Sequence, residues 1–290
     1  MSKSALLRSR LETAPLTHII GAHNPLSARL AEEAGFDGIW ASGFELSAAY
    51  GLPDASLISM TQHLDMTRAI SAAVGIPVVA DIDTGFGNAV NVMHAVAQYE
   101  AAGAAAVVIE DKMFPKDTSL LAGGRQELVR AAEFQGKIEA AGAARRSRDF
   151  LIIARTEALI AGLGQTEASM RAEAYAEAGA DAILIHSKAN TPDEIVEFVG
   201  RWRRDLPLVI VPTAYPQLTE EAIVALGKVR LVIYGNHGIR AAVTAMERVF
   251  AQIRADRGIQ NVDREIVPVG RIFELQGVAE MKRRERRYLR

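Results

Sequence analysis

Eight short apolar runs alternate with eight helical patterns along most of this chain, and that alternation limits the fold more than any other feature. The runs are Thr17–Gly21, Phe36–Ala41, Pro77–Asp81, Ala105–Glu110, Phe150–Arg155, Ala180–His186, Leu206–Pro212 and Val229–Gly235. Several are continuous Val, Ile and Leu segments, as is typical of strands buried on both faces of a parallel sheet. The helical patterns are Ser27–Ala34, Gln62–Val74, Ala89–Ala102, Arg125–Ala141, Thr166–Ala178, Thr191–Arg204, Thr219–Leu226 and Ile239–Arg257. Eight strands and eight helices in strict alternation favour a closed (β/α)8 TIM barrel over an open doubly wound sheet.

Local signals at the helix ends agree with this pattern. Glycine in an Ala-Gly pair ends a helix in a left-handed conformation, and such pairs precede three runs, as Ala34-Gly35, Ala102-Gly103 and Ala178-Gly179. Thr191-Pro192 and Thr219-Glu220 are typical of helix N-termini. No linker rich in Pro, Gly or Ser divides the chain, so we predict one barrel domain over residues 1–290, with an additional C-terminal helix over Val267–Arg290.

Charge and composition exclude several classes of function. The chain has 290 residues, a formal net charge of -2 and no cysteine. It therefore offers no bulk attraction for nucleic acid or an anionic membrane, and neither a thiolate metal site nor a cysteine nucleophile. Its apolar runs are too short to span a bilayer, which takes about 20 residues. We expect a cytoplasmic enzyme, and we interpret the basic C-terminal end as a solvated or subunit-facing helix.

Polar residues gather where the predicted strands end. In a barrel, reacting groups lie at the C-terminal ends of strands and on the loops that follow. These positions hold Trp40, Ser42, Gly43, Asp54, Asp81, Asp83, Glu110, Arg155 and His186. Because the strand ends meet at one mouth of the barrel, we expect these side chains to converge there.

The acidic members of this set predict a divalent metal site. Asp81 and Asp83 are two positions apart, so their side chains share one face of an extended segment, and Glu110 ends the next strand. Together with Asp54, they would repel one another unless a cation neutralised them. An oxygen-only set of ligands favours Mg²⁺ or Mn²⁺.

Arg155 and His186 add donors to the same mouth, as a site for a carboxylate or phosphonate requires. The segment Glu110–Ser119, followed by Gly123 and Gly124, has the composition of a mobile lid that brings Lys116 over a bound anion. A solvated loop is the alternative interpretation of this segment.

Three motifs of the sequence occur together in one known group of enzymes. Asp81-Ile82-Asp83-Thr84-Gly85-Phe86-Gly87, the loop from Glu110 to Lys116, and Trp40-Ala41-Ser42-Gly43 resemble the phosphoenolpyruvate mutase and isocitrate lyase superfamily. The resemblance runs in order from about Leu16 to about Gly238. It implies an α/β barrel that binds Mg²⁺ and 2-keto acid-like substrates, with Mn²⁺ or Co²⁺ as possible substitutes. It also implies a homotetramer, a dimer of dimers that exchange the last barrel helix between subunits.

The resemblance also implies a role for each site residue. Asp81 would ligate Mg²⁺ directly, while Asp54, Asp83 and Glu110 would hold its waters. Ser42, with the backbone N–H groups of Gly43 and Phe44, would receive the carboxylate and carbonyl oxygens of the substrate beside Trp40. Arg155 and His186 would contact a phosphonyl group, and Lys116 would cover it.

Within the superfamily, the lid distinguishes the reactions. The carbon–carbon lyases place a catalytic Cys in this loop, which this chain lacks, and the mutases carry Asn where this chain has Thr118. Lys116-Asp117-Thr118-Ser119 resembles instead the branch that hydrolyses the P–C bond of phosphonopyruvate to pyruvate and phosphate. Thr is smaller than Asn and can accept a hydrogen bond from a water, so Thr118 would favour attack by water on the phosphoryl group.

Three other readings of the sequence stay open. The chain could be a mutase that returns the phosphoryl group to the enolate oxygen, or a 2-keto acid decarboxylase or lyase that works without cysteine. A barrel that binds a keto acid without turnover is the remaining alternative, and it would require neither Lys116 nor a cluster of metal-binding carboxylates. Asp54 could act as a transient nucleophile or only organise the waters of the metal.

Overall fold

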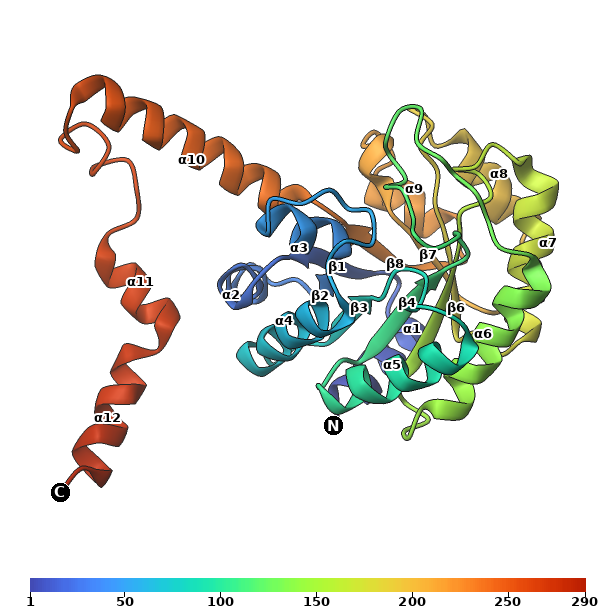
Figure 1. Ribbon diagram of the computed structural model, residues 1–290, viewed down its shortest axis with the longest axis horizontal. Helices are drawn as coiled ribbons and strands as arrows, with labels where there is room; N and C mark the ends of the chain where they lie inside the picture. Colours follow the sequence, from blue (N-terminus) through green and yellow to red (C-terminus); the bar gives the residue numbers. More distant parts are fainter. The chain divides into compact units, whose positions relative to one another are not determined.

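The computed structural model describes residues 1–290, and its eight parallel strands close into a barrel in sequence order (Figure 1). The strands are β1 (Thr17–Ala22), β2 (Gly38–Ala41), β3 (Val78–Asp81), β4 (Ala106–Glu110), β5 (Leu151–Thr156), β6 (Ala182–Ile185), β7 (Leu208–Ile210) and β8 (Val229–Tyr234). Each strand pairs with the next, and β8 pairs with β1, so no edge is left open. The predicted barrel is confirmed.

Helices follow the strands in order, as expected for this fold, and all but the last, α10, which has no buried residue, cover the barrel. They are α2 (Pro25–Glu33), α4 (Met60–Ala73), α5 (Ala89–Ala101), α6 (Ala131–Ala144), α7 (Gly164–Glu177), α8 (Asp193–Arg201), α9 (Glu220–Ala225) and α10 (His237–Asp256). Helix α1 (Lys3–Thr13), helix α3 (Gly43–Ala49) and the 3-10 turn η1 (Pro212–Ala214) were not predicted. Helix α1 has only two buried residues, Leu7 and Leu11, and α3 is short, so neither gives a clear periodic pattern.

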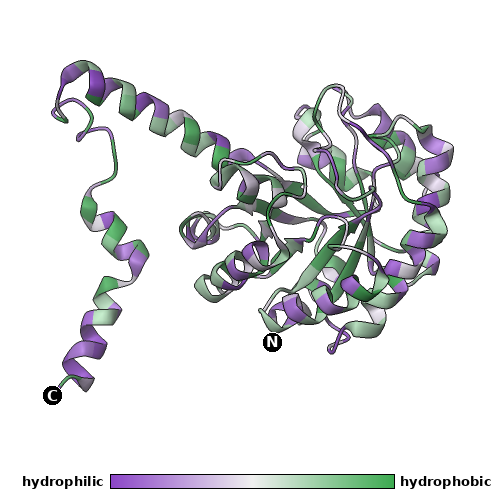
Figure 2. Cartoon of the chain, in the orientation of Figure 1, coloured by the Kyte–Doolittle hydropathy of each residue, from purple (hydrophilic) through white to green (hydrophobic).

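The core has an inner and an outer part, because side chains of a strand alternate between its two faces. Val108, Ile153, Leu184 and Ile233 belong to a cluster inside the barrel, which also contains Leu7 of α1. The intervening residues of the strands pack against the surrounding helices in a second cluster. Figure 2 shows the apolar strands at the centre and the mixed composition of the helices. The packed interior leaves the ends of the strands as the place for chemistry.

The helix ends bear out most of the local signals. Gly35, Gly103 and Gly179 have φ values of 88°, 86° and 92°, in the left-handed region. Thr219 caps α9 by accepting a hydrogen bond from Ala222 N at 3.3 Å. The predicted cap at Thr191 is wrong, because its hydroxyl donates to Asp193 and α8 has no side-chain cap.

Two compact units make up the chain, Met1–Ile239 and Arg240–Arg290. In the second unit the predicted helix over Val267–Arg290 is divided into α11 (Val269–Gln276) and α12 (Val278–Tyr288). Gly277 separates them with a φ of 73°, which a continuous right-handed helix cannot contain. The organisation as a single domain stays a prediction. No helix is both long and apolar enough to cross a membrane.

Candidate active site

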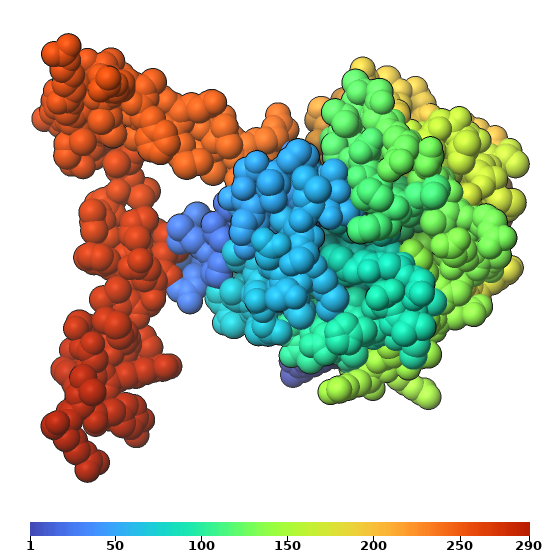
Figure 3. Space-filling model, in the orientation of Figure 1, coloured from blue at the N-terminus to red at the C-terminus, as the bar shows by residue number.

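A cavity of about 70 Å³ lies at the C-terminal end of the barrel strands. It is lined by Trp40, Ser42, Phe44, Asp54, Asp81, Lys116, Thr118, Ser119, Leu120, Arg155, His186, Val211, Thr213, Gly235 and Asn236. Every predicted site residue except Gly43, Asp83 and Glu110 is in this set. The loop after α3 and the segment around residue 120 lie side by side over this end of the barrel (Figure 3), and Lys116 N donates to Ser56 Oγ at 3.3 Å. The predicted convergence at one mouth is therefore found.

The acidic residues surround an ammonium group. Lys116 Nζ lies 2.7 Å from Asp83 Oδ1, 3.1 Å from Asp54 Oδ1 and 3.8 Å from Glu110 Oε1. Burial raises the pKa of Asp83 to about 7, and burial likewise raises the pKa of Asp81. Burial alone would lower the pKa of Lys116, but the surrounding carboxylates raise it well above its usual value. Lys116 is therefore charged and neutralises part of the cluster.

The same carboxylates retain free lone pairs, as a metal site requires. Both carboxylate oxygens of Glu110 are buried and accept no hydrogen bond, although Lys116 Nζ lies 3.8 Å from Oε1 and Arg155 Nε lies 3.3 Å from Oε2. All the donors are hard oxygens, which suit Mg²⁺. No three acidic or histidine side chains are arranged to hold one ion together. This chemistry fits an ion held directly by few protein oxygens and otherwise by water, as expected for Asp81 with its acidic neighbours.

The beginning of α3 forms another wall of the cavity. Ser42 ends the extended segment after β2 and accepts a hydrogen bond from Glu45 N at 3.2 Å, which caps α3. The N–H of Gly43 donates to Asp81 Oδ2 at 3.4 Å. A Cβ at Gly43 would lie 3.0 Å from Asp83 Oδ1 and 3.4 Å from Asp81 Oδ2, so only glycine fits beside this pair without a shift.

Arg155 and His186 come from adjacent strand ends and contact each other. Arg155 Nη2 lies 2.9 Å from His186 Nδ1, and Arg155 Nε lies 3.3 Å from Glu110 Oε2. Burial lowers the pKa of His186, with a further lowering by Arg155 that Glu157 opposes. His186 Nε2 is buried and has no hydrogen-bond partner. The pair thus presents a permanent cation and a ring nitrogen to the cavity.

The predicted lid is a loop whose two ends are joined. Lys112 and Leu128 form an antiparallel bridge, and Met113 N donates to Glu127 O at 2.9 Å. This pairing explains why α6 begins at Ala131 and not at the predicted Arg125, because residues 125–130 return the loop to the barrel. Thr118 and Lys116 lie on this loop and line the cavity.

Several lining residues were missed in the sequence. Thr213 and Asn236 follow β7 and β8, so the rule applied to the other strand ends could have identified them. Glu157 does not line the cavity but contacts Arg155 and His186, which do. It lies two positions after Arg155, so the argument that placed Asp81 and Asp83 on one face of a strand could have identified it.

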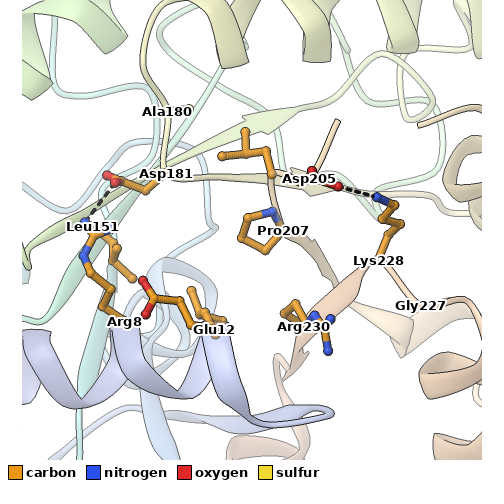
Figure 4. Close-up of a pocket in the computed structure, with 12 residues that line it drawn as sticks. Arg8, Glu12, Leu151, Ala180, Asp181, Asp205, Pro207, Gly227, Lys228 and Arg230 are labelled. Atoms are coloured by element: carbon orange, nitrogen blue, oxygen red, sulfur yellow. Dashed lines mark hydrogen bonds and ion pairs between the residues drawn. The ribbon is translucent and has the colours of Figure 1, made fainter. Parts of the chain in front are cut away.

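A larger cavity, of about 650 Å³, lies at the opposite end of the barrel (Figure 4). Arg8 and Glu12 of α1 line it, together with residues that precede β6, β7 and β8, such as Asp181, Asp205 and Lys228. Its charges are largely paired, since Arg8 contacts Asp181 at 2.9 Å and Lys228 contacts Asp205 at 3.1 Å. It contains none of the predicted site residues and lies away from the strand ends that carry chemistry in this fold.

Comparison with known proteins agrees with this geometry. The phosphoenolpyruvate phosphomutase family matches residues 7–254. Phosphonopyruvate hydrolase from Variovorax sp. (strain Pal2) is 63% identical over 290 residues, covering 100% of both chains. Phosphoenolpyruvate phosphomutase from Tetrahymena pyriformis is 43% identical over 287 residues, covering 99% of this chain and 95% of that protein. A crystal structure of phosphonopyruvate hydrolase in complex with oxalate and Mg²⁺ has a TM-score of 0.95 at 62% identity, covering 100% of both chains.

Proposed function

The chain belongs to the phosphoenolpyruvate phosphomutase family, and from this premise we propose that it hydrolyses phosphonopyruvate to pyruvate and phosphate. One observation carries the choice of reaction. The chain is 63% identical to a hydrolase over its full length, against 43% to a phosphomutase over nearly the same length. The enzyme takes Mg²⁺ as its cofactor, the ion present in the hydrolase structure with oxalate.

Each wall of the cavity takes one part of the substrate. The Ser42 hydroxyl and the N–H groups of Gly43 and Phe44 receive the oxygens of the keto acid. Arg155 and His186 bind the phosphonyl group at the other side, where His186 Nε2 has no protein partner. Asp81, Asp54, Asp83 and Glu110 would hold the metal and its waters. Mg²⁺, when bound there, supplies positive charge opposite the carboxylate and carbonyl oxygens.

The reaction breaks one bond to phosphorus and forms another. The electron pair of the P–C bond moves to the keto acid, which becomes the pyruvate enolate and takes a proton to give pyruvate. The phosphoryl group is loosely bound in its transition state, and a water oxygen captures it to give phosphate. Arg155 stabilises charge on the phosphoryl oxygens, because the electrostatic attraction of a guanidinium to these oxygens is stronger in a buried site than in water. Lys116 neutralises part of the negative charge on the carboxylate side of the closed site.

Thr118 decides which oxygen captures the phosphoryl group. It is only partly buried and lies on the lid, where it lines the cavity. Its small side chain leaves room for a water, and its hydroxyl accepts a hydrogen bond that orients this water. A larger amide at the same place would exclude the water and leave the enolate oxygen as the nearest acceptor.

The test is to incubate the purified protein with phosphonopyruvate and Mg²⁺ and to follow the products by phosphorus NMR, alongside Thr118→Asn. We expect phosphate from the wild type and a lower ratio of phosphate to phosphoenolpyruvate from the variant. Phosphoenolpyruvate as the main product of the wild type would make the enzyme a mutase. Faster turnover of oxaloacetate than of phosphonopyruvate would make it a decarboxylase or lyase. The homotetramer and the cytoplasmic location stay predictions.

A further inference from the structure

One fully buried carboxylate, that of Glu157, has no part in the reaction described above. It follows β5, and the backbone N–H of Glu157 donates to Asp111 Oδ1 at 2.9 Å, which fixes its place behind the cavity. Its two oxygens contact different parts of the molecule. Oε1 faces the residues that bind the phosphonyl group, and Oε2 faces the lid.

Oε1 holds the pair Arg155 and His186. It accepts a hydrogen bond from Arg155 Nε at 2.5 Å and lies 3.1 Å from His186 Nδ1. A guanidinium with one edge held in this way has fewer orientations open to it, so its remaining N–H groups are aimed before substrate arrives.

Oε2 holds the lid. It accepts a hydrogen bond from Ser119 Oγ at 2.5 Å and lies 3.3 Å from Lys112 Nζ. The Lys112 ammonium also donates to Ser119 Oγ at 2.8 Å and to Asp117 O at 2.7 Å, so it holds one further point of the loop, Asp117, at the same place. Arg155 Nη2 donates to Ser119 Oγ at 3.0 Å, which closes the network.

This network links the position of the lid to the orientation of the binding pair. A buried carboxylate that loses a partner is costly, because the charge stays buried without compensation. If the lid lifts, Ser119 leaves Oε2, and the carboxylate can turn toward water and release Arg155. Burial alone would raise the pKa of Glu157, but Arg155, His186 and Lys112 hold it well below its usual value, so the group is charged when the network is complete.

We propose that Glu157 is a positioning residue that couples closure of the lid, through Ser119 and Lys112, to the orientation of Arg155 and His186 for the phosphonyl group. The proposal rests on the proposed function for the identity of that group. The coupling between the lid and the Glu157 carboxylate is a property of the protein, and cleavage of the lid measures it without turnover.

The experiment compares Glu157→Gln, Ser119→Ala and the double variant, with Ser56→Ala as a matched control. Ser56 also accepts a hydrogen bond from the lid, at Lys116 N, but does not contact Glu157. Opening of the lid is measured as the rate of tryptic cleavage after Arg125, an exposed residue of the loop. Inhibition by inorganic phosphate reports the phosphonyl side, and binding of oxalate with Mg²⁺ reports the keto-acid side.

We expect each single variant to raise the rate of cleavage about tenfold, and the double variant to raise it by much less than the product of the two effects. Ser56→Ala combined with Glu157→Gln should instead give the product of its single effects. Phosphate should inhibit the Glu157→Gln variant about tenfold more weakly than it inhibits the wild type. The affinity of this variant for oxalate should stay within about twofold of the wild-type value. Glu157→Asp should restore part of both properties.

The proposal would be overturned if Glu157→Gln and Ser119→Ala acted independently on the rate of cleavage. It would also be overturned if Glu157→Gln weakened inhibition by phosphate and binding of oxalate equally. If Glu157→Gln does not fold, the Ser119→Ala variant alone tests the proposal. Faster cleavage of its lid with unchanged inhibition by phosphate would contradict the coupling. A wild type that fails to hydrolyse phosphonopyruvate would refute the proposed function, while the cleavage measurements would still decide whether lid and carboxylate are coupled.

Discussion

Lys116 occupies the centre of the acidic cluster with an ammonium group that is almost completely buried. A buried charge is stable only when its partners compensate for lost hydration, and here three carboxylates do so. The same ammonium shares this space with any divalent cation that the carboxylates bind. At the scale of a single residue, the stability of the protein and its affinity for metal are therefore linked.

Lys116→Met should lower the free energy of unfolding by about 3–5 kcal/mol in the presence of a chelator, because it leaves buried carboxylates without a counter-charge. Mg²⁺ should raise the melting temperature of this variant by more than it raises that of the wild type. The measurement is thermal unfolding with and without Mg²⁺.

Lys137→Met is the control, since this buried lysine donates to Thr84 O at 2.9 Å and is in no ion pair with the cluster. Its loss of stability should not depend on Mg²⁺. An equal response of both variants to the metal would refute the link between Lys116 and metal binding.

His63 makes stability depend on pH. Burial lowers the pKa of His63 to about 4, whereas the unfolded chain has the ordinary value near 6.5. The unfolded state therefore binds more protons between these two values, so the stability present above pH 6.5 is lost as the pH falls toward 4. This loss amounts to roughly 3 kcal/mol at pH 4.

In urea titrations, His63→Asn should be less stable than the wild type at pH 7, because the smaller side chain leaves a gap in the packing. The difference between the two proteins should shrink as the pH is lowered to 4. A constant difference over this range would show that His63 is not the group responsible.

At the scale of an element, a residue that is typical of a helix N-terminus does not always form the capping hydrogen bond. Thr191 and Thr219 both stand before a helix in the sequence, yet only Thr219 forms a cap. At Thr191 the hydroxyl instead donates a hydrogen bond to the carboxylate of Asp193 at 2.8 Å. A competing acceptor two residues away thus overrides a preference that holds on average.

Thr219→Ala should therefore lower the free energy of unfolding by about 1 kcal/mol, because a backbone N–H of α9 loses its partner. Thr191→Ala is the matched control and should change it by less than about 0.5 kcal/mol, as is usual for a surface substitution. The free energies of unfolding are measured by denaturant titration of both variants. An equal loss of stability in the two variants would contradict the assignment of the caps.

At the scale of the whole molecule, α10 has no buried residue, although one of its faces is apolar. Val243, Met246 and Phe250 are 43%, 44% and 65% exposed, and their spacing of three and four places them on the same face. An exposed apolar face of this kind marks a surface for association. It agrees with the predicted homotetramer.

Phe250→Glu should reduce the molecular mass measured by light scattering, because a charge in an apolar contact between subunits is costly. Ala241→Glu places the same charge on the opposite face of the helix, about 180° around its axis, and should leave the mass unchanged. A wild type with the mass of one chain would contradict the homotetramer itself.

The sequence by itself determined the barrel and the strand ends on which the site is built. Apolar runs and helical patterns are local signals. Parallel strands that close in order must bring their carboxyl ends to one mouth, so Asp81, Glu110, Arg155 and His186 could be assigned there in advance. Only the tertiary structure decided which of these charges meet. Lys116 lies among the carboxylates and Glu157 joins the lid to Arg155 because the loop folds back over the barrel, and contacts across that distance in sequence leave no periodic pattern to read.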